Sequence, residues 1–222
     1  MLRALLTITV LAATLAMAAP STGLLFGGDY FAAGPTAELA QPNAKDAFLA
    51  GEYATVTAAV AGNVHAAART VRIDGPVGQN LYGVGQNVLI TQPIAGHASL
   101  GGYSIRIDDN IGGNLRAGGR NLTLNGTVGG NALLTAKDLH IQGTIEGDAL
   151  INTDNLTFGP DAQINGKITL YQRDSDSRAI PESVAEKDRL TVKPYAGWNF
   201  KDTSTPWAFW ADLGSVRCCW LR

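Results

Sequence analysis

The sequence has little charge and almost no cysteine. Charged residues make up 16% of the 222 residues, and the formal net charge is only −2. Nucleic-acid binding by phosphate neutralisation needs a strongly basic surface, so no nucleic-acid partner is expected. The two cysteines, Cys218 and Cys219, are adjacent, which fits neither a disulfide framework nor a four-ligand zinc site. With 45% hydrophobic residues, the chain can form one sizeable folded domain.

Residues 1–18 have the three parts of a secretory signal peptide. A basic start at Arg3 precedes an apolar run over residues 4–16, and Ala16-Met17-Ala18 forms a small-residue cleavage site. The apolar run is too short to cross a bilayer comfortably, so a cleaved signal is favoured over an uncleaved anchor. We therefore expect export, to the periplasm or cell envelope if the source is bacterial.

A repeat of 17 residues fills the middle of the chain. Full copies begin at Val60, Val77, Ile94, Ile111 and Val128, and degenerate copies begin at Phe26 and Asn43. The next copies begin at Ile145 and, after a two-residue insertion within residues 159–163, at Ile164. A fixed period of this length is typical of a solenoid, in which each repeat buries its apolar face only against its neighbours.

Aligned positions of the repeat predict which side chains face inward. Positions 12 and 14 are apolar in every copy, with polar residues usual between them, as in a half-buried strand. Position 1 is apolar except at Asn43. Positions 5 and 7 exchange large and small residues, as in Leu81 with Gly83 and Ala98 with Leu100. Three inward faces per repeat predict an all-β fold: a parallel, three-sided β-helix of about eight coils over residues 26–170, with two open ends.

Position 4 is a column of Asn and Asp. We interpret it as a structural corner in which stacked amides hydrogen-bond from coil to coil, in preference to a cation or ligand ladder. The best-conforming members of this corner column are Asn63, Asn80, Asn114, Asn131 and Asp148.

No catalytic, metal-binding or cofactor-binding group is predicted. His65, His97 and His140 occupy different repeat positions on separated coils, so they are expected to be solvated or turn residues. Asp108 and Asp109 are neighbours but do not form the paired carboxylates of a glycosidase, and they are expected to mark a corner. We therefore do not expect an enzyme.

Position 6 points outward and yet is unusually apolar. It suggests a lateral contact stripe along the rod, or a surface covered by the C-terminal tail, and the sequence leaves both open. Its apolar members are Phe31, Phe48, Tyr82, Leu133 and Leu150.

The repeated pattern Val/Ile-Gly-Gly-Asn, followed by two apolar strand positions and Gly-Thr, is clearest from Ile111 to Thr144. This pattern resembles the bactofilins, bacterial polymer-forming cytoskeletal proteins, over about residues 26–170. The resemblance implies a right-handed β-helix that assembles end to end into filaments without nucleotide. The signal peptide points to an exported branch of that family, whose members often continue into C-terminal membrane segments. The irregular stretch from Phe26 to Pro42 is a candidate partial cap.

The repeat ends after Leu170. Residues 171–189 are polar and are interpreted as a linker, and residues 190–222 form a Trp-rich tail that begins with a short apolar strand. The tryptophans fit a membrane boundary or packing on the rod end equally well, and the tail is a candidate truncation before a membrane segment.

Two functions are carried forward from the sequence. The first is a self-assembling scaffold of the envelope, with end-to-end copies of itself as partner and the inner membrane as a second contact. The alternative is a non-catalytic periplasmic adaptor that binds peptidoglycan or another polysaccharide.

Overall fold

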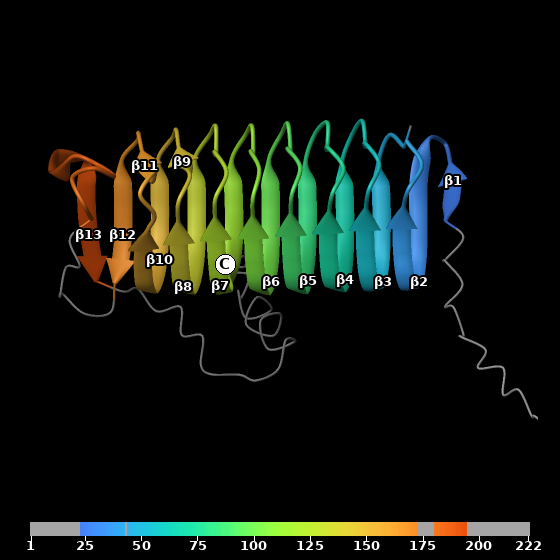
Figure 1. The fold of residues 1–222 in the computed structure, drawn as a ribbon, viewed down its shortest axis with the longest axis horizontal. Coiled ribbons are helices and arrows are strands. Elements are labelled where there is room, and N and C mark those ends of the chain that lie inside the picture. The colour runs from blue at the N-terminus through green and yellow to red at the C-terminus, as the bar shows by residue number, and fades with distance from the viewer. Residues whose placement is uncertain (1–22, 43, 173–179, 195–222) are drawn as a thin grey trace, which may run out of the picture.

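The protein is a β-solenoid (Figure 1). The computed structural model describes residues 23–42, 44–172 and 180–194. Eleven strands form one continuous sheet in the order β1-β2-β3-β4-β5-β6-β7-β8-β10-β12-β13, and every pair except β1 with β2 is parallel. The long strands are β2 (Asp29–Leu39), β3 (Ala47–Val56), β4 (Val64–Ile73), β5 (Leu81–Ile90), β6 (Ala98–Ile107), β7 (Leu115–Leu124), β8 (Ala132–Ile141) and β10 (Ala149–Phe158).

The register confirms the 17-residue period. Leu115 pairs with Ala132 and Ala132 with Ala149, so equivalent positions of successive coils lie side by side. The register also confirms the predicted two-residue insertion, because Ala149 pairs with Ile168, 19 residues later, at the start of β12 (Ile168–Gln172). Each position of the sequence repeat thus forms a column of stacked side chains along the solenoid.

The three sides of a coil are not three short strands of equal length. One strand, ten residues long in β3 to β8 and β10, carries repeat positions 5 to 14 and so supplies two inward faces. The third side is a single bridging residue at position 1 in most coils, such as Val60 paired with Val77. Among the described residues, β9 (Thr144–Ile145) and β11 (Gln163–Ile164) alone extend this side into a short strand pair.

The predicted inward columns form the core. Side chains at position 12 are buried as far along the chain as Leu156, and those at position 14 as far as Ile141. Side chains at position 1 are buried from Val60 to Ile164. In the second coil the bridging residue is Ala44, which pairs with Val60, so Ala44 takes the inward place that the repeat assigned to Asn43. Asn43 itself lies outside the described residues.

The size exchange at positions 5 and 7 acts between coils. A Cβ added at Gly83 would lie 3.3 Å from Leu100 Cδ2, which belongs to the next coil. The small residue of one coil therefore makes room for the large residue stacked on it. Such interdigitation keeps the interior close-packed, and the position-5 column beside it is also buried, at Leu81, Ala98 and Leu115.

The N-terminal end, which the sequence predicted to be open, is partly covered by a tyrosine and a hairpin. β1 (Leu24–Phe26) pairs antiparallel with β2 through a two-residue turn, Gly27-Gly28, in which both φ angles are positive (64° and 96°), as a tight hairpin requires. Tyr30 stands in register with the inward residue Ala47, packs on the core, and donates a hydrogen bond from its hydroxyl to the Glu38 carbonyl oxygen at 2.5 Å. Burial, followed by the nearby Glu38 charge, raises the pKa of Tyr30.

The C-terminal end is closed by part of the segment that the sequence predicted as a linker. Ile180, Val184 and Ala185 are buried, and the Ile164 amide donates to the Val184 carbonyl oxygen at 2.9 Å, as Val128 does to Thr144 two repeats earlier. After a 3-10 turn (Lys187–Arg189), β13 (Leu190–Pro194) pairs in parallel with β12. The apolar strand expected at the start of the tail is thus confirmed, and the described residues 180–189 add a partial coil where a free linker was expected.

Candidate interaction surfaces

The Asn/Asp corner column forms a hydrogen-bond ladder along the solenoid. The side-chain oxygen at position 4 of one coil accepts a hydrogen bond from the backbone amide of position 4 in the next, for example Asn114 Oδ1 from Asn131 at 2.9 Å and Asn131 Oδ1 from Asp148 at 2.9 Å. The ladder runs from Asp46 through Asn63 and Asn80 to Asp148, whose oxygen accepts from the Lys167 amide at 2.8 Å. These oxygens are therefore engaged within the fold, which supports the structural interpretation of the column.

Glycine before the corner residue makes room for this ladder. A Cβ at Gly130 would lie 2.3 Å from Asn114 Oδ1, and one at Gly147 would lie 2.3 Å from Asn131 Oδ1. Where Gln79 replaces this glycine, the ladder bond from the Asn80 amide to Asn63 Oδ1 lengthens to 3.2 Å. The Gly-Asn pairs of the repeat are thus explained by close approach between coils.

The three histidines lie apart, in three different environments. His97 belongs to the ladder, because its Nδ1 accepts from the Asn114 amide at 2.7 Å. His65 is half-buried between two aromatic rings, and His140 lies 2.9 Å from the Thr157 hydroxyl. In the described part of the chain, no group of three or more His, Cys, Asp or Glu side chains is placed to hold a metal ion.

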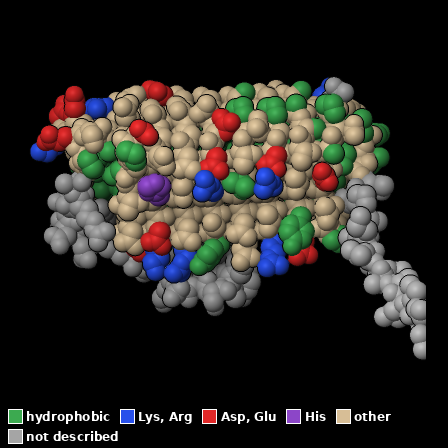
Figure 2. All heavy atoms as spheres, in the orientation of Figure 1, with side chains coloured by type: hydrophobic (Ala, Val, Ile, Leu, Met, Phe, Trp, Pro, Cys, Tyr) green, Lys and Arg blue, Asp and Glu red, His purple; other side chains and the backbone are tan. Residues whose placement is uncertain are grey.

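Asp108, at the predicted corner, is paired with the arginine two residues before it, at the end of the preceding strand. Arg106 Nε donates to Asp108 at 2.8 Å, and Asn125 Nδ2 of the next coil donates to the same carboxylate at 2.6 Å. Burial opposes ionisation of Asp108, but these two hydrogen bonds and the Arg106 charge outweigh it and lower the pKa of Asp108. Arg72, Asp74 and Thr91 repeat the arrangement two coils earlier. Figure 2 shows basic and acidic side chains lying next to one another along this charged face.

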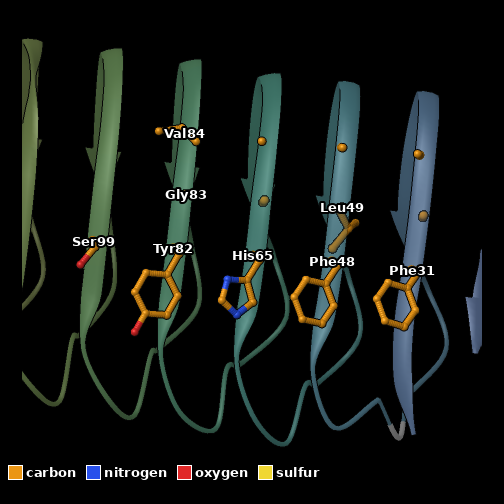
Figure 3. Close-up of a pocket in the computed structure, with 13 residues that line it drawn as sticks. Phe31, Phe48, Leu49, His65, Tyr82, Gly83, Val84 and Ser99 are labelled. Atoms are coloured by element: carbon orange, nitrogen blue, oxygen red, sulfur yellow. The ribbon is translucent and has the colours of Figure 1, made fainter. Parts of the chain in front are cut away.

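The outward position 6 column forms an aromatic ridge at the N-terminal half of the rod. The rings of Phe31, Phe48, His65 and Tyr82 stack in parallel, with centroids 4.7–5.0 Å apart (Figure 3). The inner rings cover each other's faces, so mainly their edges reach the surface. A sugar-binding platform needs an exposed ring face, which the inner rings of this ridge do not offer.

The ridge borders a shallow hollow of about 730 Å³. Its floor is made of small residues at position 8, Ala33, Ala50 and Ala67, followed by Val84. The remaining two residues of the predicted lateral stripe, Leu133 and Leu150, pair with each other farther along the same column and are 45% and 39% exposed. The structure therefore places all five predicted stripe residues in one line, with His65, Ser99 and Arg116 between them.

A second apolar surface lies at the N-terminal end, and the sequence analysis did not identify it. Leu24, Leu25 and Phe26 of β1 are 62%, 62% and 74% exposed. Beyond the three residues paired with β1, the outer edge of β2 has no strand partner among the described residues. The only sequence signal was the run Leu-Leu-Phe before Gly-Gly, which looks like an ordinary strand until its position at the rod end is known.

The fold defines the class of the protein as a parallel β-solenoid. No protein-family model, curated protein or solved structure matches the chain. The relationship to the bactofilins therefore stays a prediction from the repeat. In the described residues, no helix is long and apolar enough to cross a membrane. The proposed signal peptide and most of the tail lie outside the described residues.

Proposed function

We propose that the protein is a non-catalytic structural protein of the bacterial cell envelope that associates with itself through the ends of its solenoid. The observation that carries this proposal is the N-terminal end, where three exposed apolar residues of β1 adjoin a strand edge without a partner. An unpaired edge beside an apolar surface is a template for a second chain. Export to the envelope rests on the signal-peptide pattern of residues 1–18.

The two ends support different contacts. The N-terminal end offers Leu24, Leu25 and Phe26, whereas the C-terminal end is covered by the partial coil of residues 180–194. Association through the N-terminal ends would be isologous and would give a pair of rods. Growth into a filament would then use the outer edge of β13, where Val192 is 46% exposed.

Light scattering on a dilution series of the full chain, with negative-stain electron microscopy of the same samples, tests this function. We expect concentration-dependent growth of rods without added nucleotide. Replacing Leu25 and Phe26 with Lys should return the sample to single rods, whereas the same change at Leu89, an outward residue of β5 away from both ends, should not.

Single rods of the unaltered chain at every concentration would contradict the proposal. Co-sedimentation of such single rods with purified cell wall would then favour the wall-binding adaptor.

A further inference from the structure

The outward face that carries the aromatic ridge is almost free of charge. We define the lateral strip as the outward positions 6 and 8 of the eight coils, from Phe31 to Asn152. It contains no Asp or Glu, and Arg116 is its one Lys or Arg. Charge returns next to it at position 10, with Glu52, Arg69 and Lys137. In its first four coils the strip is apolar apart from His65, and an exposed apolar patch beside charged residues is typical of a surface that another segment covers.

The shape of the strip suits an extended segment laid along the rod. The stacked rings form one wall of the hollow, and the flat floor of Ala50 and Ala67 forms its base (Figure 3). Because the inner ring faces are covered, a flat ligand cannot stack on them. Large apolar side chains lying against the ring edges and the alanine floor would fill the hollow.

The chain leaves the described solenoid on this same sheet. β13 pairs with β12 so that Thr191 is in register with Thr169, and Thr169 is in register with Leu150 of the strip. β13 is thus in line with the strip, and the described chain ends on this sheet at Pro194, directly before residues 195–222. Nine strand spacings of about 4.8 Å separate β13 from β2, or roughly 43 Å, whereas residues 195–222 can extend to about 90 Å.

The composition of residues 195–222 complements the strip. The segment contains all four tryptophans of the protein, Trp198, Trp207, Trp210 and Trp220, together with Phe200 and Phe209. Tryptophan and phenylalanine bury large apolar areas and are the side chains that a wide, shallow apolar hollow accommodates.

We propose that residues 195–222 fold back along the lateral strip of their own solenoid and place tryptophan side chains in the hollow beside the aromatic ridge. This inference concerns the side of the rod and does not rest on end-to-end association. The strip is then an internal docking surface, and its occupant is the segment that follows Pro194.

Tryptophan fluorescence of the full chain tests this proposal, because every tryptophan belongs to the proposed occupant. We expect blue-shifted emission and weak quenching by acrylamide. Replacing Ala50 and Ala67 with Glu puts charge on the floor of the hollow, and both alanines are exposed, so the solenoid keeps its core. This variant should shift the emission to the red and raise the quenching constant severalfold. Ala95→Glu, at an exposed alanine outside the strip, should change neither.

Three results would overturn the proposal. The first is emission typical of solvated tryptophan in the unaltered chain. The second is blue-shifted emission that A50E/A67E leaves unchanged, which would place the tryptophans elsewhere. The third is protection that appears only as protein concentration rises or only with lipid vesicles, which would make the occupant a second copy or a membrane. Circular dichroism of each variant verifies that the solenoid is intact.

Discussion

At the residue scale, glycine and asparagine depend on each other across coils. The position-3 glycine of one coil lies against the position-4 side chain of the coil before it, so that an added methyl group would overlap the accepting oxygen. A pattern that looks like a flexible loop in the sequence is therefore a packing constraint. Its glycines are needed for space and not for an unusual backbone angle.

Replacing Gly130 with Ala should destabilise the protein by about 1–3 kcal/mol, since backbone of Gly113 and the Asn114 side chain must both move. Gly83→Ala is the matched control, because its new Cβ would come nearest to the flexible end of Leu100 at 3.3 Å, with the side chains of Val88 and Val71 at 3.9 and 4.0 Å. Urea unfolding of the two variants measures the difference. Equal losses would show that close approach at the ladder is not what selects glycine.

His97 should be replaceable by Asn but not by Ala. His97→Asn keeps a side-chain acceptor for the Asn114 amide, whereas His97→Ala removes it and should cost about 1 kcal/mol more. Chemical denaturation of both variants at neutral pH measures this difference. Equal stability of the two variants would mean that the bond to Nδ1 contributes nothing to the fold.

The ionisation of Asp108 should make the stability of the folded protein depend on pH in the acidic range. Its pKa is lowered in the folded protein, so its contribution is present above the ordinary pKa of 3.8 and is lost as pH falls through the lower folded value. Because the pair with Arg106 is partly exposed, we expect a loss of less than about 1 kcal/mol. Urea unfolding between pH 5 and pH 2 should show a smaller slope for Asp108→Asn than for the unaltered protein. The same slope would contradict the assignment.

At the element scale, the sequence predicted the strands well where the period held and failed where it stopped. The apolar alternation around Ile105 and Ile107 identified a strand because the same columns recur eight times. The partial coil formed by Ile180, Val184 and Ala185 has no such repetition and a longer connection, so only its contacts with Ile164 reveal it. The ring stacking at His65 was likewise hidden, since position 6 mixes aromatic, polar and aliphatic residues.

The partial coil should protect the last coils from opening. Val184→Asp puts a charge in a buried site and should release residues 180–194, raising hydrogen exchange in β12 and β11 while β4 and β5 stay protected. Val192→Asp is the control, because Val192 is exposed. Unchanged exchange in β12 for Val184→Asp would mean that the segment does not hold this end closed.

At the scale of the whole molecule, each coil contacts its neighbours and little else, so whole coils should be removable. Deleting residues 94–110 takes out one full period and brings Asn114 onto Asn80, which restores the ladder. We expect a shorter, folded solenoid with reduced stability. Deleting residues 94–109 removes one residue fewer than a full period and so shifts the strand register by one residue. This shift exchanges inward and outward side chains and should abolish cooperative unfolding. Circular dichroism melts compare the two deletions, and similar melts would contradict the coil as the unit of the fold.

The constant period has a consequence for distances. Each additional 17 residues would move the apolar N-terminal end away from Pro194 by one strand spacing, about 4.8 Å, without altering either end. The number of repeats thus sets the distance between the two ends in steps of one strand spacing. Gaining or losing whole repeats would therefore change the separation of the two end surfaces while leaving both surfaces the same.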